Sequence, residues 1–497
     1  MSKSPPTLPA ATLLWFRLDL RLGDNQALAA ALARGGAVIP VFVWGPEEEG
    51  AAAPGAASRW WLHQSLAALD AQLRQRGSQL VIRRGRAAVA LTTLAEETGA
   101  TAVVWTRRHE PAVVARDRQV QNQLRGRGIE TVVEGGGMLL EPEQVCTQGG
   151  GPFLVFTPFW RSVTARLAGA PPPPPLPAPR RLPAPRRWPA GLALVDLGLQ
   201  PKIDWAAGMR ALWTPGEVGA QRRLRDFLSA RVTGYGEARD RPGVQGTSRL
   251  SPHLHHGEIG PRQIWHAVHQ RDGSGGAAFL RELGWREFAH HLLAHFPATV
   301  ASPLRASFAD FPAVDAPAQL AAWQRGQTGY PLVDAGMREL WTTGVMHNRV
   351  RMVAASFLTK HLLQPWQRGA RWFWETLVDA DLANNTLGWQ WVAGCGADAA
   401  PFFRIFNPVT QSQRFDEGGA YLRRWLPELA ALGDREIHAP WLAPPQVLAA
   451  AGVVLGKTYP GPIVDHDWAR QRALAAYGAM RAGGDPGHTS THEKSVG

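Results

Sequence analysis

The N-terminal fold is decided by the stretch Thr12-Leu-Leu-Trp-Phe-Arg-Leu-Asp-Leu-Arg-Leu-Gly-Asp-Asn25. Its first residues, Thr12–Phe16, are mostly apolar and predict a buried strand. The charged and amide side chains that follow predict a hydrogen-bonding turn. This turn has no Gly-x-Gly-x-x-Gly fingerprint, so a nicotinamide-binding domain loses its main support.

The residues up to about 140 repeat this alternation of short apolar runs with amphipathic helical patterns. Further strands are predicted at 38–43, 79–82, 102–105 and 129–133, with helices at 25–34, 57–76 and 87–98. Strands that alternate with helices at this spacing pair in parallel, because each helix carries the chain back across a face of the sheet. We therefore predict an α/β N-terminal domain with a doubly wound parallel sheet.

The domain organisation follows from changes in composition. The α/β domain takes residues 1–140, and a proline-rich interdomain linker takes 141–213, where Pro-Ala-Pro-Arg-Arg occurs repeatedly. Such a linker is extended and has no core of its own. From about residue 214 the pattern is helical, which predicts a larger all-α C-terminal domain at 214–481. The polar residues 482–497 predict a disordered tail.

Composition narrows the function only partly. The 497 residues carry 53 Lys and Arg against 41 Asp and Glu, which gives a formal net charge of +12. Excess positive charge attracts polyanions such as nucleic acid, but abundant Ala, Gly, Pro and Arg are also typical of genomic base bias. The 21 Trp residues are a surplus that indicates stacking on bases, contact with a flat cofactor or electron transfer.

Several classes of protein are excluded by what the sequence lacks. Two lone cysteines, Cys146 and Cys395, make neither a disulfide framework nor a zinc cluster. The histidine clusters at 253–256 and 290–295 have no Cys or Glu at ligand spacing, so we expect no metal site. The N-terminus has no apolar segment and no apolar run is long enough to span a membrane. We expect a soluble, cytoplasmic protein with no membrane partner.

Asn348 and Met352 are spaced so that they share one face of a predicted helix, whereas Arg349 and Arg351 project toward different partners. An amide beside a soft thioether is unusual for a plain core and suits a binding pocket. The alternative is that Met352 fills a gap and Asn348 forms hydrogen bonds at the end of a turn. The spacing alone leaves both interpretations open.

Residues 379–391, Asp-Ala-Asp-Leu-Ala-Asn-Asn-Thr-Leu-Gly-Trp-Gln-Trp, predict an irregular, hydrogen-bonding turn. Trp389 and Trp391 would then face different sides, one toward a buried cofactor and the other toward an open cavity. An acid-rich turn is, however, more often a helix N-cap than a ligand site. The loop Gly246–Ser251 offers hydroxyls, backbone N–H groups and one guanidinium, a set that suits a diphosphate but has many other uses.

Taken together, these segments resemble the photolyase/cryptochrome family over nearly the whole chain. The matching segments, in the family's order, are Trp15–Asn25, Gly246–Ser251, Glu282–Phe288, Thr328–Asp334, Met346–Arg349, Asp379–Trp391 and Arg404–Pro408. Two more, Pro46–Gly50 and Ser58–Leu62, are similar to plant cryptochromes and the related class III photolyases. The resemblance implies an N-terminal antenna domain and a helical domain that holds FAD in a U shape.

The resemblance assigns the flavin site residue by residue. The residues that would hold the phosphates and ribityl chain of FAD are Tyr235, Thr247, Ser248, Arg249, Leu250 and Ser251. Asp379 and Asp381 would lie along the flavin, and Arg351 would pair with Asp379. Asn385 occupies the position where photolyases place an amide against flavin N5, an apt group because an amide can hydrogen-bond a nitrogen whose electron density changes.

The resemblance also implies the substrate. Asn348 and Met352 stand where enzymes for (6-4) lesions have two His, which indicates a cyclobutane-dimer enzyme acting on UV-damaged DNA. Glu282 would hydrogen-bond the base, and Trp285 and Trp391 would wall the flipped dimer. The residues implied to contact the damaged strand are Arg239, Arg349 and Gln411. The implied reaction is light-driven electron transfer from excited FADH⁻ to the dimer, which opens the ring and returns the electron.

Two accessory features depart from the family's pattern. Trp389 and Trp366 match the inner two members of its Trp chain, but the third is missing, and Trp341 is our hypothesis for the electron's exit. Class I enzymes carry an Asn-Glu pair in the antenna site where this chain has Ala112-Val113. We expect methenyltetrahydrofolate as the antenna, with the acid run Glu47–Glu49 contributing, and keep a second flavin or no antenna as alternatives.

Three rival functions stay open. A cryptochrome would have the same fold and signal instead of repairing DNA, although the implied dimer pocket is intact. A DNA-binding module with a structural flavin would leave the Trp-x-Trp turn and Glu282 without a role. An ordinary flavin oxidoreductase would need a second substrate motif, and none appears. We expect a monomer without an obligate protein partner.

Overall fold

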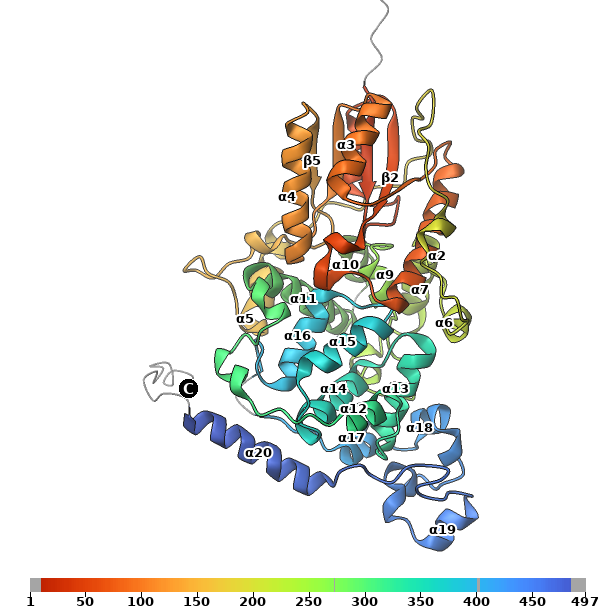
Figure 1. Ribbon diagram of the computed structural model, residues 1–497, viewed down its shortest axis with the longest axis vertical. Coiled ribbons are helices and arrows are strands. Elements are labelled where there is room, and N and C mark those ends of the chain that lie inside the picture. Colours follow the sequence, from red (N-terminus) through yellow and green to blue (C-terminus); the bar gives the residue numbers. More distant parts are fainter. Residues whose placement is uncertain (1–9, 272, 400–402, 484–497) are drawn as a thin grey trace, which may run out of the picture. The chain divides into compact units, whose positions relative to one another are not determined.

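The computed structural model describes residues 10–271, 273–399 and 403–483 of the chain (Figure 1). The chain divides into two compact units, which we describe separately. Unit 1 contains the chain up to Val300 with Glu339–Met346 and Trp372–Thr386, and unit 2 contains Ala301–Arg338, His347–Arg371 and the chain from Leu387. Within the described ranges, no helix is both long enough and apolar enough to cross a membrane.

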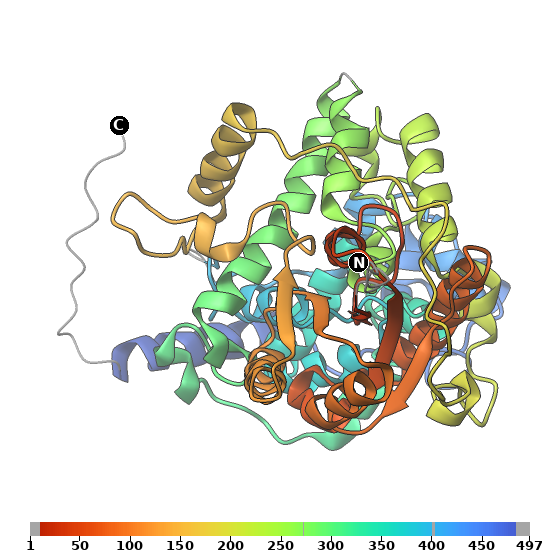
Figure 2. The ribbon, with the colours of Figure 1, turned by 90° about the horizontal axis from the view of Figure 1, so that it is seen from above.

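Unit 1 contains the predicted parallel sheet. Its strands are β1 (Thr12–Phe16), β2 (Val38–Trp44), β3 (Val81–Arg84), β4 (Ala102–Thr106) and β5 (Glu130–Glu134). They lie in the order β3-β2-β1-β4-β5, and all neighbouring pairs are parallel (Figure 2). The order reverses between β1 and β4, which confirms the doubly wound topology. In such sheets the carboxyl ends of the strands at this reversal form a ligand-binding crevice.

Helices cover both faces of the sheet. They are α1 (Gln26–Ala33), α2 (Ala56–Arg74), α3 (Ala87–Thr98) and α4 (Pro111–Arg125). Alternate residues of β1 point to opposite faces, so Leu14 shares one apolar core with Leu66 of α2, and Trp15 shares the other with Leu91 of α3. Because both faces are buried, the strands are nearly continuous apolar runs, which is why their pattern was visible in the sequence.

One strand begins later than the sequence predicts. The pattern predicts a strand from Gln79, whereas β3 begins at Val81. The amide of Leu80 donates to the carboxylate of Asp70 on α2 at 2.8 Å instead of joining the ladder. Such a side-chain contact to the backbone competes with sheet pairing and leaves no trace in a hydropathy pattern.

The segment predicted as a linker contains two helices, α5 (Phe156–Gly169) and α6 (Ala207–Leu212). The proline-rich chain between them contributes Leu182, 4% exposed, to the apolar core that contains Phe42 of β2. The segment therefore packs against the sheet domain. The predicted domain boundaries stay a prediction, and the predicted tail lies outside the described residues from residue 484 onward.

The remaining chain is helical. Unit 1 holds α7 (Glu217–Ala230), α8 (Tyr235–Ala238), α9 (Ser251–His255), α10 (Pro261–His269) and α11 (Ser274–His295). Unit 2 holds α12 (Pro317–Gln324), α14 (Asn348–Ser356), α17 (Pro408–Phe415), α18 (Ala420–Trp425), α19 (Pro445–Ala450) and α20 (His466–Gly483). Residues of both units belong to α13 (Pro331–Thr343), α15 (Trp366–Thr376) and α16 (Leu382–Ala393). This confirms the predicted helical C-terminal part.

Candidate functional site

The predicted site residues divide between the two units. Unit 1 contains Tyr235, Arg239, Thr247, Ser248, Arg249, Leu250, Ser251, Glu282, Trp285, Trp341, Asp379, Asp381 and Asn385. Unit 2 contains Asn348, Arg349, Arg351, Met352, Trp366, Trp389, Trp391 and Gln411. The contacts within each unit show which of these residues lie together.

The loop Gly246–Ser251 is fastened to the acidic turn at Asp379. The Ser251 hydroxyl donates to Asp379 Oδ2 at 2.6 Å, which ties the start of α9 to the turn before α16. Within the loop, Arg249 has φ of +53°, a left-handed conformation that is uncommon for a residue with a side chain. At Gly246, a Cβ would lie 2.4 Å from the carbonyl oxygen of Ala238, so only glycine allows the loop to pass this close to α8.

Asp381 is a carboxylate that is 12% exposed and faces two histidines. Its Oδ2 lies 3.4 Å from His290 Nε2 and 3.7 Å from His255 Nδ1. Burial alone would raise the pKa of Asp381, but His290 and His255 outweigh it and hold the pKa well below its usual value. Its Oδ1 accepts bonds from the backbone and side-chain nitrogens of Asn384, at 2.8 and 2.7 Å. The N-cap alternative is thus correct for Asp381, which caps α16 as well as lining a pocket.

Asn385 lies one helical turn after Asp381 and is half-buried. Its backbone N–H donates to the Asp381 carbonyl oxygen at 2.8 Å, so the cap and the amide belong to the first turn of α16. The acidic turn therefore fixes the backbone position from which this amide projects.

A second group of predicted residues lies on α8 and α11. Arg239, the C-cap residue of α8, forms an ion pair with Glu282 of α11, and its guanidinium lies over the Tyr235 ring, 5.6 Å from the centroid. Both charged side chains are about a quarter exposed, at 23% and 27%. The resemblance implies separate roles for Glu282 and Arg239, whereas in the structure their side chains are in direct contact.

Trp285 is one turn further along α11 from Glu282 and forms an aromatic wall. Its ring is stacked on Phe156 of α5, with centroids 3.7 Å apart and planes 8° from parallel. Trp285 is half-buried, so part of its ring remains open. The spacing of three residues puts Glu282 and Trp285 on the same side of the helix.

In unit 2, Asn348 and Met352 lie together on α14, with Asn348 Nδ2 3.9 Å from Met352 Sδ. The helix begins at Asn348, because the His347 side chain accepts the backbone N–H of Arg349 and caps it. The Arg349 guanidinium lies over the Phe415 ring of α17, 4.3 Å from the centroid. Gln411 is also on α17, and its Oε1 is buried.

The tryptophans of unit 2 are held tightly. Trp389 is buried and meets Trp323 edge-on, with ring centroids 6.2 Å apart. A Cβ at Gly369 of α15 would lie 2.0 Å from the Trp389 ring, so the packing requires glycine there. Trp391 donates from Nε1 to the Asp398 carbonyl at 3.1 Å. Trp366 is buried at the start of α15.

Trp341 of α13 lies in unit 1 and is 57% exposed. Its ring is stacked on Trp372 of α15, with centroids 6.0 Å apart and planes 7° from parallel. The sequence identified Trp341 but missed its partner Trp372.

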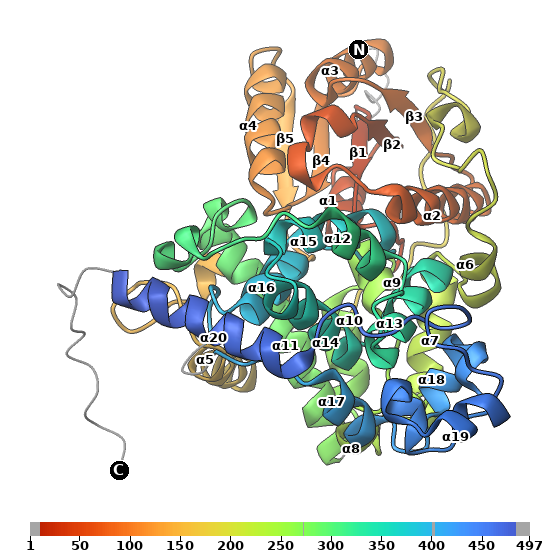
Figure 3. The same ribbon diagram turned by 60° about the horizontal axis from the view of Figure 1, so that its bottom comes forward.

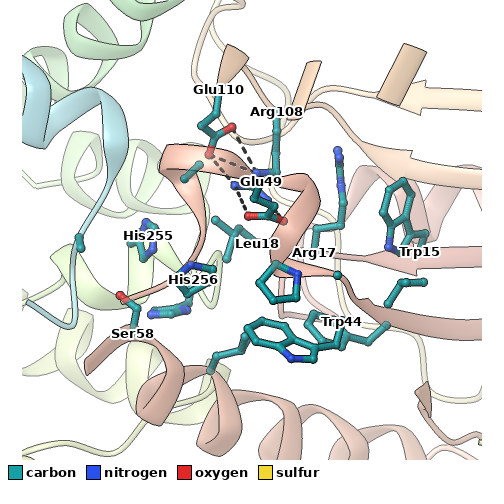
Figure 4. A pocket seen from close by; sticks show the side chains of 18 of the residues that line it. Trp15, Arg17, Leu18, Trp44, Glu49, Ser58, Arg108, Glu110, His255 and His256 are labelled. Carbon is teal, nitrogen blue, oxygen red and sulfur yellow. Dashed lines mark hydrogen bonds and ion pairs between the residues drawn. The ribbon is translucent and has the colours of Figure 1, made fainter. Parts of the chain in front are cut away.

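A pocket opens at the carboxyl ends of β1, β2 and β4 (Figure 4). Its lining includes Trp15, Arg17, Trp44, Glu49, Ser58, Arg108, Glu110, His255, His256, Trp374 and Ala380. Of the predicted acid run, only Glu49 lines it. Glu48 instead accepts the Ala87 backbone N–H at 2.6 Å at the start of α3.

The charged side chains that line this pocket form ion pairs with one another or with charges just behind the lining. Glu49 lies 3.2 Å from Arg108 and 3.0 Å from Arg116, and Arg108 lies 2.8 Å from Glu110. Burial would raise the pKa of Glu110, but Arg108 outweighs it and lowers the pKa to about 2. Glu110 is therefore ionised at neutral pH and holds Arg108 in place.

A second pocket adjoins the first. It shares Arg17, Arg108, Glu110 and His255 with it and continues past Arg286 and His290 to Asp381. The carboxyl ends of the strands and the acidic turn are thus connected by a path lined with polar residues. Most of these residues were missed by sequence reasoning, although their place directly after β1 and β4 is the signal that could have indicated them.

Comparisons with known proteins match almost the entire chain. The family description "DNA photolyase" matches residues 12–180, and "FAD binding domain of DNA photolyase" matches residues 279–479. A deoxyribodipyrimidine photo-lyase of Agrobacterium fabrum is 49% identical over 480 residues, which cover 95% of this chain and 98% of the relative. The chain belongs to the DNA photolyase family.

This photolyase family member is similar in sequence both to photolyases and to cryptochromes. Cryptochrome-2 of Arabidopsis thaliana is 40% identical over 485 residues, covering 95% of this chain and 79% of the relative. Among solved structures, a bacterial class III photolyase from Agrobacterium tumefaciens has a TM-score of 0.93 and 48% identity, covering 97% of this chain and all of that one. The resemblance stated from the sequence is confirmed, and the chain contains the family's FAD-binding domain.

Proposed function

We propose that this photolyase family member binds UV-damaged DNA and splits cyclobutane pyrimidine dimers in light, with FAD as its cofactor. The observation that carries the proposal is the 49% identity to a deoxyribodipyrimidine photo-lyase over nearly the full length of both chains. When bound in reduced form and excited by light, FAD supplies the electron that opens the dimer and takes it back.

The residues of unit 1 fit the cofactor. Thr247, Ser248 and Arg249 offer hydroxyls and a guanidinium, which is the donor set that a diphosphate requires. The bond between Ser251 and Asp379 holds this loop beside the acidic turn, so donors for the phosphates and groups for the flavin come from one rigid unit. We propose that Tyr235 and Leu250 form the floor of this loop, since both are buried in the same apolar cluster.

For the flavin ring we propose three residues from the same turn. Asp379 and Asp381 would lie along it, with Arg351 as the partner of Asp379. Asn385 would hold a hydrogen bond to flavin N5. Support comes from the cap at Asp381, which sets the first turn of α16 and hence the backbone position of Asn385.

For the dimer we propose Glu282, Trp285, Asn348, Met352 and Trp391. Trp285, stacked on Phe156, presents a preformed flat surface for an unstacked base. Glu282 would accept a hydrogen bond from the base and keep it oriented. The contact between Asn348 and Met352 supplies an amide and an apolar thioether from one helix face.

Arg239, Arg349 and Gln411 are the proposed contacts to the damaged strand. The ion pair between Arg239 and Glu282 is partly exposed, and pairs of this kind contribute only about 0–1 kcal/mol. A DNA phosphate can therefore draw Arg239 away at small cost. Glu282 then turns to the base, so that binding of the strand and release of the carboxylate occur together.

For electron supply to the cofactor we propose Trp389 and Trp366, with exit through Trp341. The exposed Trp341 ring is stacked on Trp372, and once the chain has given an electron to the flavin the pair can take one up from a reductant in solution. If Trp341→Phe leaves photoreduction of the bound flavin unchanged, the exit lies elsewhere. Trp372→Phe is the matched variant for its partner.

For the antenna we propose methenyltetrahydrofolate in the pocket of Figure 4. Trp44 and Trp374 provide aromatic surfaces, and Glu49 brings the predicted acid run into the lining. Because the pocket and the acidic turn share a wall through Ala380, a chromophore there would lie near the flavin turn.

We also propose that the protein acts in the cytoplasm as a monomer without an obligate partner. Light scattering of the purified protein tests the monomeric state.

The experiment compares two lesions. Reduced protein receives duplexes with either one cyclobutane thymine dimer or one (6-4) product, in blue light and in darkness. We expect restored thymines only with the cyclobutane dimer and only in light. Repair of neither lesion by a protein that retains FAD would overturn the proposal and favour the cryptochrome function. The 40% identity to Cryptochrome-2 is the observation that supports this second candidate.

A further inference from the structure

A cationic segment outside both pockets has no role in the proposed function. We call residues 176–192 the arginine strap. It contains Pro-Ala-Pro-Arg-Arg twice, at 177–181 and 183–187, and has no acidic residue. Its arginines are Arg180, Arg181, Arg186 and Arg187. All four are exposed, and within the described part of the chain none forms an ion pair.

The strap is fixed to the sheet domain along its length. At its start, the Asp24 N–H donates to the Leu176 carbonyl at 2.8 Å, and the Asp24 carboxylate accepts the Leu176 N–H at 3.0 Å. Arg76, just past the end of α2, donates to the Pro179 carbonyl at 3.0 Å and accepts the Leu182 N–H at 3.1 Å. These bonds bracket the first Arg-Arg pair.

The second half is held in the same way. The Val38 N–H at the start of β2 donates to the Pro183 carbonyl at 2.9 Å, and the Leu192 N–H donates to the Ile82 carbonyl of β3 at 3.0 Å. Leu182, between the two repeats, is buried in the sheet core. Figure 3 shows this yellow segment beside β3 and α2. The strap is thus an ordered surface, and binding through it would not have to order a free linker.

The chemistry of the strap fits one kind of partner. Arginine is always charged and presents planar, forked donors that match phosphate oxygens. The two Arg-Arg pairs are six residues apart, so they can be separated by at most about 20 Å. Phosphates along one strand of duplex DNA repeat every ~3.4 Å, so both pairs can contact the same duplex within about six nucleotides. A proline-rich backbone also leaves few N–H groups that could support sequence-specific contacts.

We propose that the arginine strap is a second, damage-independent surface that binds the phosphate backbone of duplex DNA. It is built on α2, β2 and β3, whereas the proposed dimer contacts of unit 1 are on α8 and α11. Its effect is to hold undamaged duplex near the protein and to raise the chance of meeting a lesion.

The test is binding of the full chain to an undamaged, fluorescent duplex by anisotropy, over a range of NaCl concentrations. Each phosphate contact contributes about 0.9 to the slope of log affinity against log salt. Replacing the four strap arginines with Gln should lower that slope by about 2 to 4. The same four positions changed to Lys should keep most of the slope, because Lys still neutralises phosphate.

The control removes the same charge elsewhere in unit 1, at exposed arginines without an ion pair in the described structure. These are Arg118 and Arg125 of α4 and Arg161 and Arg166 of α5. Changed to Gln, they should alter the slope by less than about 1. Equal losses in the strap and control variants, or an unchanged slope in the strap variant with unchanged melting temperature, would overturn the proposal. Because the duplex has no dimer, the result does not depend on whether repair is observed.

Discussion

Two charged clusters of unit 1 are built in opposite ways. On α8 and α11, Arg239 and Glu282 form one ion pair that is partly open to water. At the carboxyl ends of the strands, Arg108 is bound by Glu49 and Glu110 in a largely buried network, which we call the strand-end cluster. An exposed pair is cheap to separate, whereas a buried charge stripped of its partner is expensive. The first cluster can exchange its partner for a substrate, and the second is suited to keeping a pocket in shape.

The largest difference between the two clusters is expected in the loss of stability when the arginine of each is removed. Arg108→Ala leaves Glu49 and Glu110 without a shared partner at a buried site, and loss of one member of a buried pair costs about 3–5 kcal/mol. We expect a clear fall in the melting temperature. Arg239→Ala is the matched variant on the other cluster and should cost about 1 kcal/mol or less. Equal losses would show that the two clusters do not differ as described.

The next effect is on repair. Glu282→Gln keeps the size of the side chain and removes its charge, so the hydrogen bond that we propose to the base would weaken. A hydrogen bond to a charged group contributes about 1.5–3 kcal/mol, so we expect its weakening to lower the yield of restored thymines per absorbed photon. Single-turnover repair in calibrated blue light measures this. Full yield in this variant would remove Glu282 from the dimer pocket.

Acid should selectively weaken the ion pairs of Arg108 with Glu49 and Glu110 at the carboxyl ends of the strands. The folded-state pKa of Glu110 is about 2, below its value in the unfolded chain, so its ionised form stabilises the fold. That contribution is present above the unfolded pKa of about 4.3 and is lost as the pH falls toward 2. We expect the melting temperature to drop over this range, and less steeply in Glu110→Gln. Identical pH profiles would contradict the pairing with Arg108.

The smallest effect is expected at the antenna pocket. Trp374→Ala removes an aromatic wall of the antenna pocket, so the purified variant should no longer retain the methenyltetrahydrofolate that we propose there. Repair driven by light that only the flavin absorbs should keep its yield, because the variant leaves the dimer residues untouched. The ratio of repair at the two wavelength ranges measures the difference. A fall in yield at both would place Trp374 in the flavin or dimer site.

The difference between the clusters also explains what the sequence could predict. Glu282 with Trp285, and Asn348 with Met352, lie within one helix each, so their spacing along the chain is their spacing in space. Arg108, Trp44 and Trp374 come from separate elements, and only the strand order brings them together. The pairing of Glu282 with Arg239 and the stacking of Trp341 on Trp372 join different helices and were equally hidden.

The fold itself was predictable where burial was complete. The apolar runs of β1 and β4 located the sheet, and the strand–helix alternation set its parallel topology. The start of β3 was missed because Asp70 takes the Leu80 amide out of the ladder. The strap was assigned to a linker because proline marks extended chain, and nothing in its composition showed that Leu182 enters the core.

The measurement that tests the central claim most directly is light-dependent repair of a duplex carrying one cyclobutane thymine dimer. Reduced wild-type protein with bound FAD is illuminated with blue light, and a second sample stays in darkness. We expect the two thymines to be restored in the illuminated sample alone. Retained FAD with no repair in light would contradict the account and would favour a photoreceptor function.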